Sequence, residues 1–168
     1  MEVKGATLLY TLATLAVTFA GFAALLLIVR QSAGRALSAL DRFLARTVVG
    51  HFFWLATGAL FPPVFALYDL PDPGIWKLSA ALFGLPMLAL MVSYPRRRVV
   101  ATGQPTPSII LLVFVGVSSA ALTVMMIAVF WGFAAPAAYA SALLTIFATH
   151  AFAFVVALEV ILRQAKRT

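Results

Sequence analysis

The charged side chains divide this sequence into long apolar segments. The longest, residues 99–158, runs for sixty residues without one charged side chain. That length is about three times the roughly 20 residues that cross a bilayer. A soluble domain would need charged side chains over its surface to stay dispersed. The pattern therefore predicts an integral membrane protein.

Turn-forming residues set the number of spans. The glycine and prolines of residues 103–107 predict a loop, after which Ser108 can cap a helix. Gly132 and Pro136 predict a turn between the last two helices. Together with three earlier apolar segments, these signals predict an all-α bundle of five transmembrane helices in a single domain. The expected spans are about 6–29, 47–68, 77–94, 108–131 and 136–162.

The basic residues predict the orientation. Ten of the 12 Lys and Arg residues fall after the first span, before the fourth span or in the C-terminal tail. Five spans place these three segments on one side, and cytoplasmic segments are enriched in Lys and Arg. We therefore expect the N-terminus outside and the C-terminus in the cytoplasm. The arginines expected at lipid headgroups are Arg35, Arg42, Arg46, Arg96, Arg97 and Arg98.

The segment after the first span predicts a short amphipathic helix, at about residues 36–46, that leads into the second span. Ser38 and Asp41 have the spacing of a capping box. Leucines and Phe43 lie on one face of this helix, and arginines lie on another. A linker lying in the membrane interface is the simpler interpretation. A docking surface for a partner is the alternative.

Composition narrows the class of protein further. The chain is 64% hydrophobic and 10% charged, as expected for a chain that lies mostly in lipid. The basic residues that give the net charge of +7 lie beside apolar spans. We therefore expect them to contact anionic lipid headgroups, and we expect no binding of nucleic acid. The absence of cysteine excludes disulfides and thiolate ligands. We expect no cofactor and no metal. The first apolar run has no small-residue cleavage site and is interpreted as a retained helix.

Small and hydroxyl side chains recur at helical spacing in three spans. Because lipid provides no hydrophobic force between helices, such residues mark where helix backbones approach each other. We expect these rows to be internal contacts of the bundle, with a homo-oligomer seam or a polar conduit as the alternative. The expected packing residues are Thr14, Thr18, Gly21, Gly116, Ser119, Thr145 and Thr149.

Three prolines fall inside predicted spans. Pro62, Pro63 and Pro86 cannot donate a backbone hydrogen bond to the preceding turn, so we expect kinks there. Such breaks line cavities or act as hinges in transporters. A plain packing feature is the simpler interpretation.

Three candidate site residues with titratable side chains lie within or near the expected hydrocarbon region: His51, His150 and Glu159. Counted from the nearest arginines, His51 and Glu159 lie near the cytoplasmic boundary, whereas His150 lies near the membrane centre. The two histidines then differ in depth by roughly 12 Å, which argues against shared haem ligation. A pair of His51 and Glu159 would relay protons or bind a cation.

Simpler roles compete with that candidate site. Glu159 has the favourable spacing to pair with Arg163 on the same helix face. His150 follows Thr149 and is expected to form a hydrogen bond across helices. Neither role requires transport or catalysis.

The inventory of motifs argues against an enzyme. The sequence has no HExxH motif, no Gly-rich phosphate loop and no pair of buried carboxylates. We expect a non-enzymatic accessory or assembly-forming component that acts through helix–helix and anionic-lipid contacts. Its expected partners are the bilayer and a second copy or another membrane subunit. The alternative is a small channel or proton-coupled carrier that uses His51 and Glu159.

One segment carries a family resemblance. Residues 17–22, VTFAGF, are followed by Arg30 and an arginine-bearing loop. This arrangement resembles small uncharacterised bacterial inner-membrane proteins with several spans. The resemblance covers the first helix and the following loop, and it implies a bacterial inner membrane without implying an activity.

Overall fold

The computed structural model describes residues 3–32 and 37–165, and the side chains of Arg30 and residues 157–165 lie outside this description. Within the described part, the regular elements are all helices. Between residues 108 and 131, three elements follow one another without a break, because the backbone stays right-handed helical where they join. The elements are α1 Ala6–Ser32, α2 Ala39–Ala66, α3 Asp72–Thr102, α4 Ser108–Ile110, the π-helix η1 Leu111–Val117, α5 Ser118–Trp131 and α6 Ala135–Ala165.

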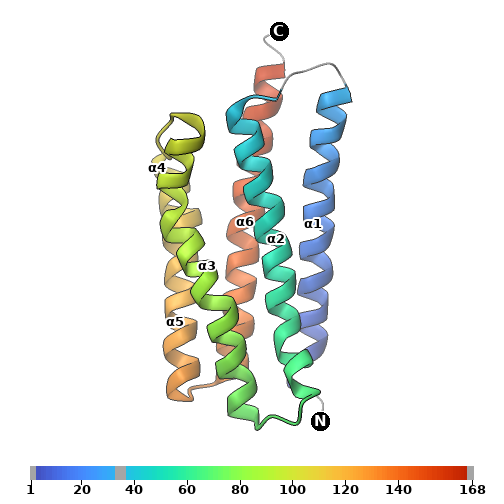
Figure 1. The fold of residues 1–168 in the computed structure, drawn as a ribbon, viewed down its shortest axis with the longest axis vertical. Coiled ribbons are helices and arrows are strands. Elements are labelled where there is room, and N and C mark those ends of the chain that lie inside the picture. Colours follow the sequence, from blue (N-terminus) through green and yellow to red (C-terminus); the bar gives the residue numbers. More distant parts are fainter. Residues whose placement is uncertain (1–2, 33–36, 166–168) are drawn as a thin grey trace.

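Five helical rods are long and apolar enough to cross a membrane: α1, α2, α3, the α4–η1–α5 rod and α6. They run side by side along the long axis of the molecule, with α1 beginning at one end and α6 finishing at the other (Figure 1). The predicted all-α bundle of five transmembrane helices is therefore confirmed. Its orientation in the membrane stays a prediction.

Two helices extend beyond their predicted ends. α2 begins at Ala39, so residues 39–46 are its first turns, and their place in the membrane interface stays a prediction. The capping box is confirmed, because the Ser38 hydroxyl accepts the Asp41 N–H at 3.1 Å and the Asp41 carboxylate accepts the Ser38 N–H at 2.9 Å. α3 continues through its three arginines because arginine is a good helix former. It ends at Gly103, whose φ of 68° is left-handed.

α2 occupies the centre of the bundle. It contacts α1, α3 and α6, while α5 closes the other side against α3 and α6 (Figure 1). Side chains from all five rods form one continuous apolar core, in which Phe52, Met87, Leu122 and Leu143 are fully buried. This core places one side of α2 opposite α6, which determines where the polar groups of those helices meet.

The predicted contact row on α1 is wrong. Thr14 and Thr18 are exposed, and each hydroxyl donates to a carbonyl one turn earlier in its own helix. Gly21 is exposed too, with open space where a Cβ would stand. Ala16 and Ala20 are buried instead. Alanine methyl groups let α1 and α2 approach closely, so the bundle uses the alanine face and leaves the threonine face outside.

The other two rows lie partly inside the bundle. Thr149 is buried and shares a 2.8 Å hydrogen bond with Ser118 across the α5–α6 contact. Ser119 and Thr145 are half-buried, and the Thr145 hydroxyl donates to a carbonyl of its own helix. Gly116 is exposed, so its expected internal contact is wrong. One hydroxyl pair therefore links these helices directly.

Candidate functional site

The two histidines meet in the core between α2 and α6. His51 Nδ1 lies 3.1 Å from His150 Nε2, and the two side chains are 3% and 2% exposed. The expected depth difference of roughly 12 Å is therefore wrong. That expectation measured His51 from Arg46, whereas α2 begins at Ala39 and carries His51 deeper. The expected hydrogen bond of His150 across helices is confirmed.

The hydrogen bonds define the tautomers of the neutral pair. His150 Nδ1 lies 2.7 Å from the Ile146 carbonyl, which can only accept, so Nδ1 carries the proton. His150 Nε2 is then the acceptor, and His51 Nδ1–H donates to it. This leaves a lone pair on His51 Nε2, which is buried without a hydrogen-bond partner among the described residues. The pair thus has one open position for a proton.

Phe114 packs against both imidazoles. Its ring stacks on His51 with centroids 5.8 Å apart and an angle of 17°, and it lies 4.5 Å from the His150 ring. Phe114 belongs to η1, a π-helical segment of seven residues. Such segments are rare and are frequent at functional sites. The irregular backbone therefore places an aromatic ring directly on the histidine pair.

The contact between the imidazoles bears on haem ligation. Two histidines that hold a haem iron from opposite sides have their coordinating nitrogens about 4 Å apart, given iron–nitrogen bonds of roughly 2.0 Å. The observed separation of 3.1 Å is that of a direct hydrogen bond. The depth argument against haem therefore no longer holds.

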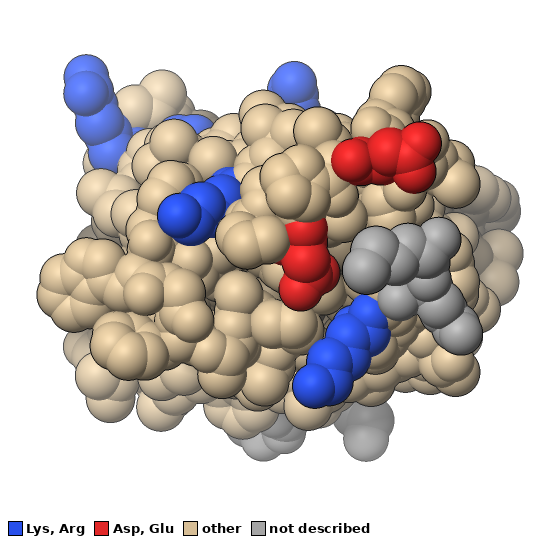
Figure 2. Space-filling view, turned by 90° about the horizontal axis from the view of Figure 1, so that it is seen from below, with Lys and Arg blue, Asp and Glu red and all other residues tan. Residues whose placement is uncertain are grey.

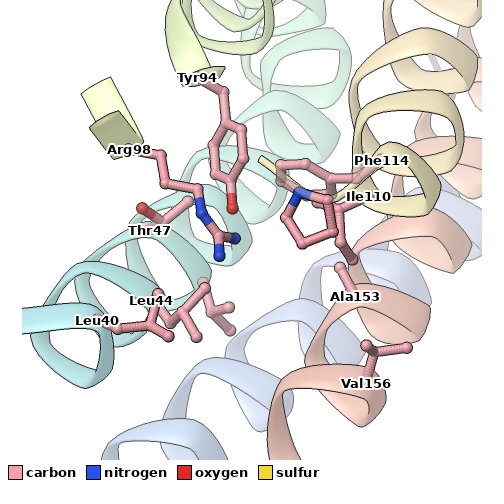
Figure 3. Close-up of a pocket in the computed structure, with 11 residues that line it drawn as sticks. Leu40, Leu44, Thr47, Tyr94, Arg98, Ile110, Phe114, Ala153 and Val156 are labelled. Carbon is pink, nitrogen blue, oxygen red and sulfur yellow. The ribbon is translucent and has the colours of Figure 1, made fainter. Parts of the chain in front are cut away.

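A partly open cavity of about 100 Å³ lies beside Phe114, where α2 begins, α3 ends and α4 begins. Arg98, only 7% exposed, turns its guanidinium into this space together with the hydroxyl end of Tyr94 (Figure 3). The remaining walls are apolar apart from Thr47. We call this space the Arg98 cavity; its lining is Leu40, Leu44, Thr47, Val48, Tyr94, Arg98, Pro107, Ile110, Phe114, Ala153 and Val156.

Phe114 joins the two sites. Its ring lines the Arg98 cavity and packs against both histidines. It also contacts the Tyr94 ring, with the two ring centroids 5.0 Å apart. Tyr94 precedes Arg98 by four residues, so both lie on one face of α3. That spacing is a signal from which Tyr94 could have been predicted. Phe114 offers no comparable signal, since its position depends on the π-helical turn.

The transmembrane prolines lie near carbonyls that accept hydrogen bonds from other side chains. Pro62 cannot donate to the Gly58 carbonyl, and the Tyr139 hydroxyl of α6 donates to it at 2.7 Å. Near Pro86, the Trp54 indole of α2 donates to the Phe83 carbonyl of α3 at 3.3 Å. These bonds tie neighbouring helices together. The first of them favours a packing role over a hinge for Pro62, whereas the role of Pro86 stays a prediction.

The remaining predicted residues are placed as follows. The side chains of Glu159 and Arg163 lie outside the description, so the pairing of Glu159 with His51 or Arg163 stays a prediction. Arg35 also lies outside the described residues. Arg97 is half-buried and donates to the Leu90 carbonyl at 2.8 Å. Pro63 is half-buried within α2; the exposed arginines are Arg42, Arg46 and Arg96.

Comparisons with known proteins give no family for this chain: no family model, curated protein or solved structure matches it.

Proposed function

We propose that this protein is a non-enzymatic membrane component that binds anionic lipids at its arginine-rich end and contacts other membrane helices. The distribution of charge over the two ends of the bundle carries the proposal. Arg42, Arg46 and residues 96–98 gather where α2 begins and α3 ends, with Asp41 as the acidic side chain described there. A cluster of this kind beside apolar spans is what anionic headgroups attract.

The opposite end has a different character. Lys4 and Lys77 share it with Asp69 and Asp72, and acidic and basic side chains stand side by side in the view from below (Figure 2). An end with both signs of charge has little net attraction for an anionic surface. Each additional Lys or Arg near such a surface contributes about 1 kcal/mol. Lipid binding is therefore assigned to one end of the bundle only.

The exposed face of α1 supports the second part of the proposal. Thr14, Thr18 and Gly21 are exposed among the residues that the structure describes, so they are available to another membrane helix. The partner is a second copy or a different subunit, as in the alternative seam considered for this row.

The test compares thermal unfolding in bilayer nanodiscs of phosphatidylglycerol and of phosphatidylcholine with the same acyl chains. A ligand that binds the folded state raises its stability, so we expect a higher unfolding temperature in phosphatidylglycerol. The difference should shrink with added salt, because salt screens exposed charges. Equal unfolding temperatures in the two lipids at low salt would contradict the proposal.

One observation favours a second candidate, a proton-coupled carrier. The hydrogen-bonded pair of His51 and His150 lies in the core with one open nitrogen, as a proton-transfer site requires. A carrier of this kind would dissipate a pH gradient across the membrane of proteoliposomes, and His51→Leu would abolish that dissipation. Proteoliposomes that hold the gradient as well as empty vesicles do, across a broad panel of added ions and solutes, would remove this candidate.

A further inference from the structure

We propose that the Arg98 cavity binds the phosphate group of one anionic glycerophospholipid. The inference rests on the proposed function and assigns it a specific site. Arg98 differs from the exposed Arg96 two residues earlier, because its side chain is 93% buried and turned into the bundle. A ligand of Arg98 would therefore be enclosed by the bundle, whereas a ligand of Arg96 would be bound only at the surface.

The burial of Arg98 calls for an anion. Removing a cation from water costs several kcal/mol unless it is paired and hydrogen-bonded. The Nε–H of Arg98 is buried and has no hydrogen-bond partner within the described ranges. An arginine fork binds phosphate oxygens through two parallel hydrogen bonds, so a phosphate in the cavity would satisfy this donor.

A second polar side chain, that of Tyr94, completes the polar side of the site. The phenol of Tyr94 points toward the guanidinium from the same helix, α3 (Figure 3), and Thr47 lines the space from α2. The phenol can donate a hydrogen bond to an anionic oxygen. Arg98 and Tyr94 lie on α3, while the apolar walls come from α2, α4 and α6, so the bundle fold creates the site and no single helix contains it.

The size and walls of the cavity identify the source of the phosphate as a lipid. A cavity of about 100 Å³ has room for a phosphate group. Leu40, Leu44, Ile110 and Val156 line the rest of the space, so an attached glycerol and chain can leave along apolar side chains. A free hydrated anion would gain nothing from these walls.

The depth of Arg98 agrees with a headgroup. Arg98 lies four residues before the end of α3 at Thr102, or about 6 Å along the helix axis. Ile110 and Leu40 lie in the first turns of their helices. The cavity therefore lies at the level where phosphates and acyl chains meet in a bilayer.

The test is native mass spectrometry of the full chain with bound phosphatidylglycerol, at increasing collision energy. Arg98→Gln should weaken retention of the last bound lipid about tenfold or more, because it removes charge-assisted hydrogen bonds in a buried site. Arg96→Gln removes the same charge from the surface and should weaken retention about fivefold at most. Equal losses in the two variants would overturn the assignment to the cavity.

A second pair of variants leaves every charge in place. Ala153→Leu fills the cavity from α6 and should remove the retained lipid, whereas Ala148→Leu on the exposed side of α6 should not. Retention unchanged in Ala153→Leu would overturn the assignment even if Arg98→Gln failed to fold. Displacement of the lipid by millimolar inorganic phosphate would show a site for free anions and would overturn the lipid assignment.

The outcomes separate this inference from the proposed function. If Arg98→Gln retains phosphatidylglycerol as wild type does, while wild type still prefers it over phosphatidylcholine, the cavity is wrong and the general lipid proposal stands. If wild type shows no preference, both proposals fail.

Discussion

Gly58→Ala is expected to destabilise the protein by about 1–3 kcal/mol, the usual cost of overpacking a well-packed core. A Cβ at this position would overlap the ring of Phe83, with ring carbons Cε2 and Cγ at 2.8 Å. Phe83 is fully buried and contacts Tyr139, so its ring has no free direction in which to move. The methyl group would therefore force α2 and α3 apart.

The same change at Gly50 should have the opposite sign. Gly50 lies on the same helix, and a Cβ there meets nothing within 4 Å. Alanine is favoured over glycine in a helix interior by about 1 kcal/mol, so Gly50→Ala should be neutral or stabilising. Unfolding by SDS in mixed micelles measures both variants. If the two substitutions shift the transition equally, the close α2–α3 contact is absent.

The second large effect concerns the histidine pair. His51→Leu leaves the acceptor His150 Nε2 without its partner, and His150→Leu leaves the donor His51 Nδ1–H without its partner. A buried polar group that loses its partner costs about 1–3 kcal/mol. Replacement of both histidines by leucine removes both unpaired groups, so the double variant should be clearly more stable than the sum of the single effects implies.

A double-mutant cycle measures this coupling in the same SDS titration. We expect a coupling of about 1–3 kcal/mol between residues in contact. The control combines His150→Leu with Ser79→Ala. Ser79 is buried on α3, several turns away from Tyr94, and Tyr94 is the α3 residue that contacts Phe114 beside the histidines. That control pair should be additive. Additive effects in the histidine cycle would show that the two rings do not touch.

The number of spans could be predicted because charge and turn residues are strong signals in a membrane chain. Gly103 and Gly132 do end helices, and both have positive φ. The helix ends near the arginines were less predictable, because a charged residue in the sequence does not show where the helix itself begins or ends. For this reason His51 was expected closer to the cytoplasmic boundary than it lies, and its contact with His150 was not predicted.

The face of α1 that packs could not be predicted for a different reason. In a soluble protein, the buried face is apolar and the outer face is polar. Lipid is as apolar as a protein core, so Leu8 and Val17 remain outside while Leu9 and Ala16 are buried. Threonine hydroxyls can bond to their own helix, as at Thr14 and Thr18, and then do not require a neighbouring helix.

The Tyr139–Gly58 hydrogen bond could be predicted from the sequence only in part. Pro62 must leave the Gly58 carbonyl without its helical donor, which follows from the sequence alone. The identity of the new donor does not follow, since Tyr139 is 81 residues further along the chain. Contacts of this kind depend on how the helices are arranged.

Cysteine labelling tests the topology on which the lipid proposals depend. The chain has no native cysteine, so Tyr68→Cys and Gln104→Cys place single thiols in exposed turns at opposite ends of the bundle. A membrane-impermeant maleimide should label Tyr68→Cys in intact cells and Gln104→Cys only after permeabilisation. Labelling of both positions from one compartment, or the reverse pattern, would contradict an arginine-rich end in the cytoplasmic leaflet.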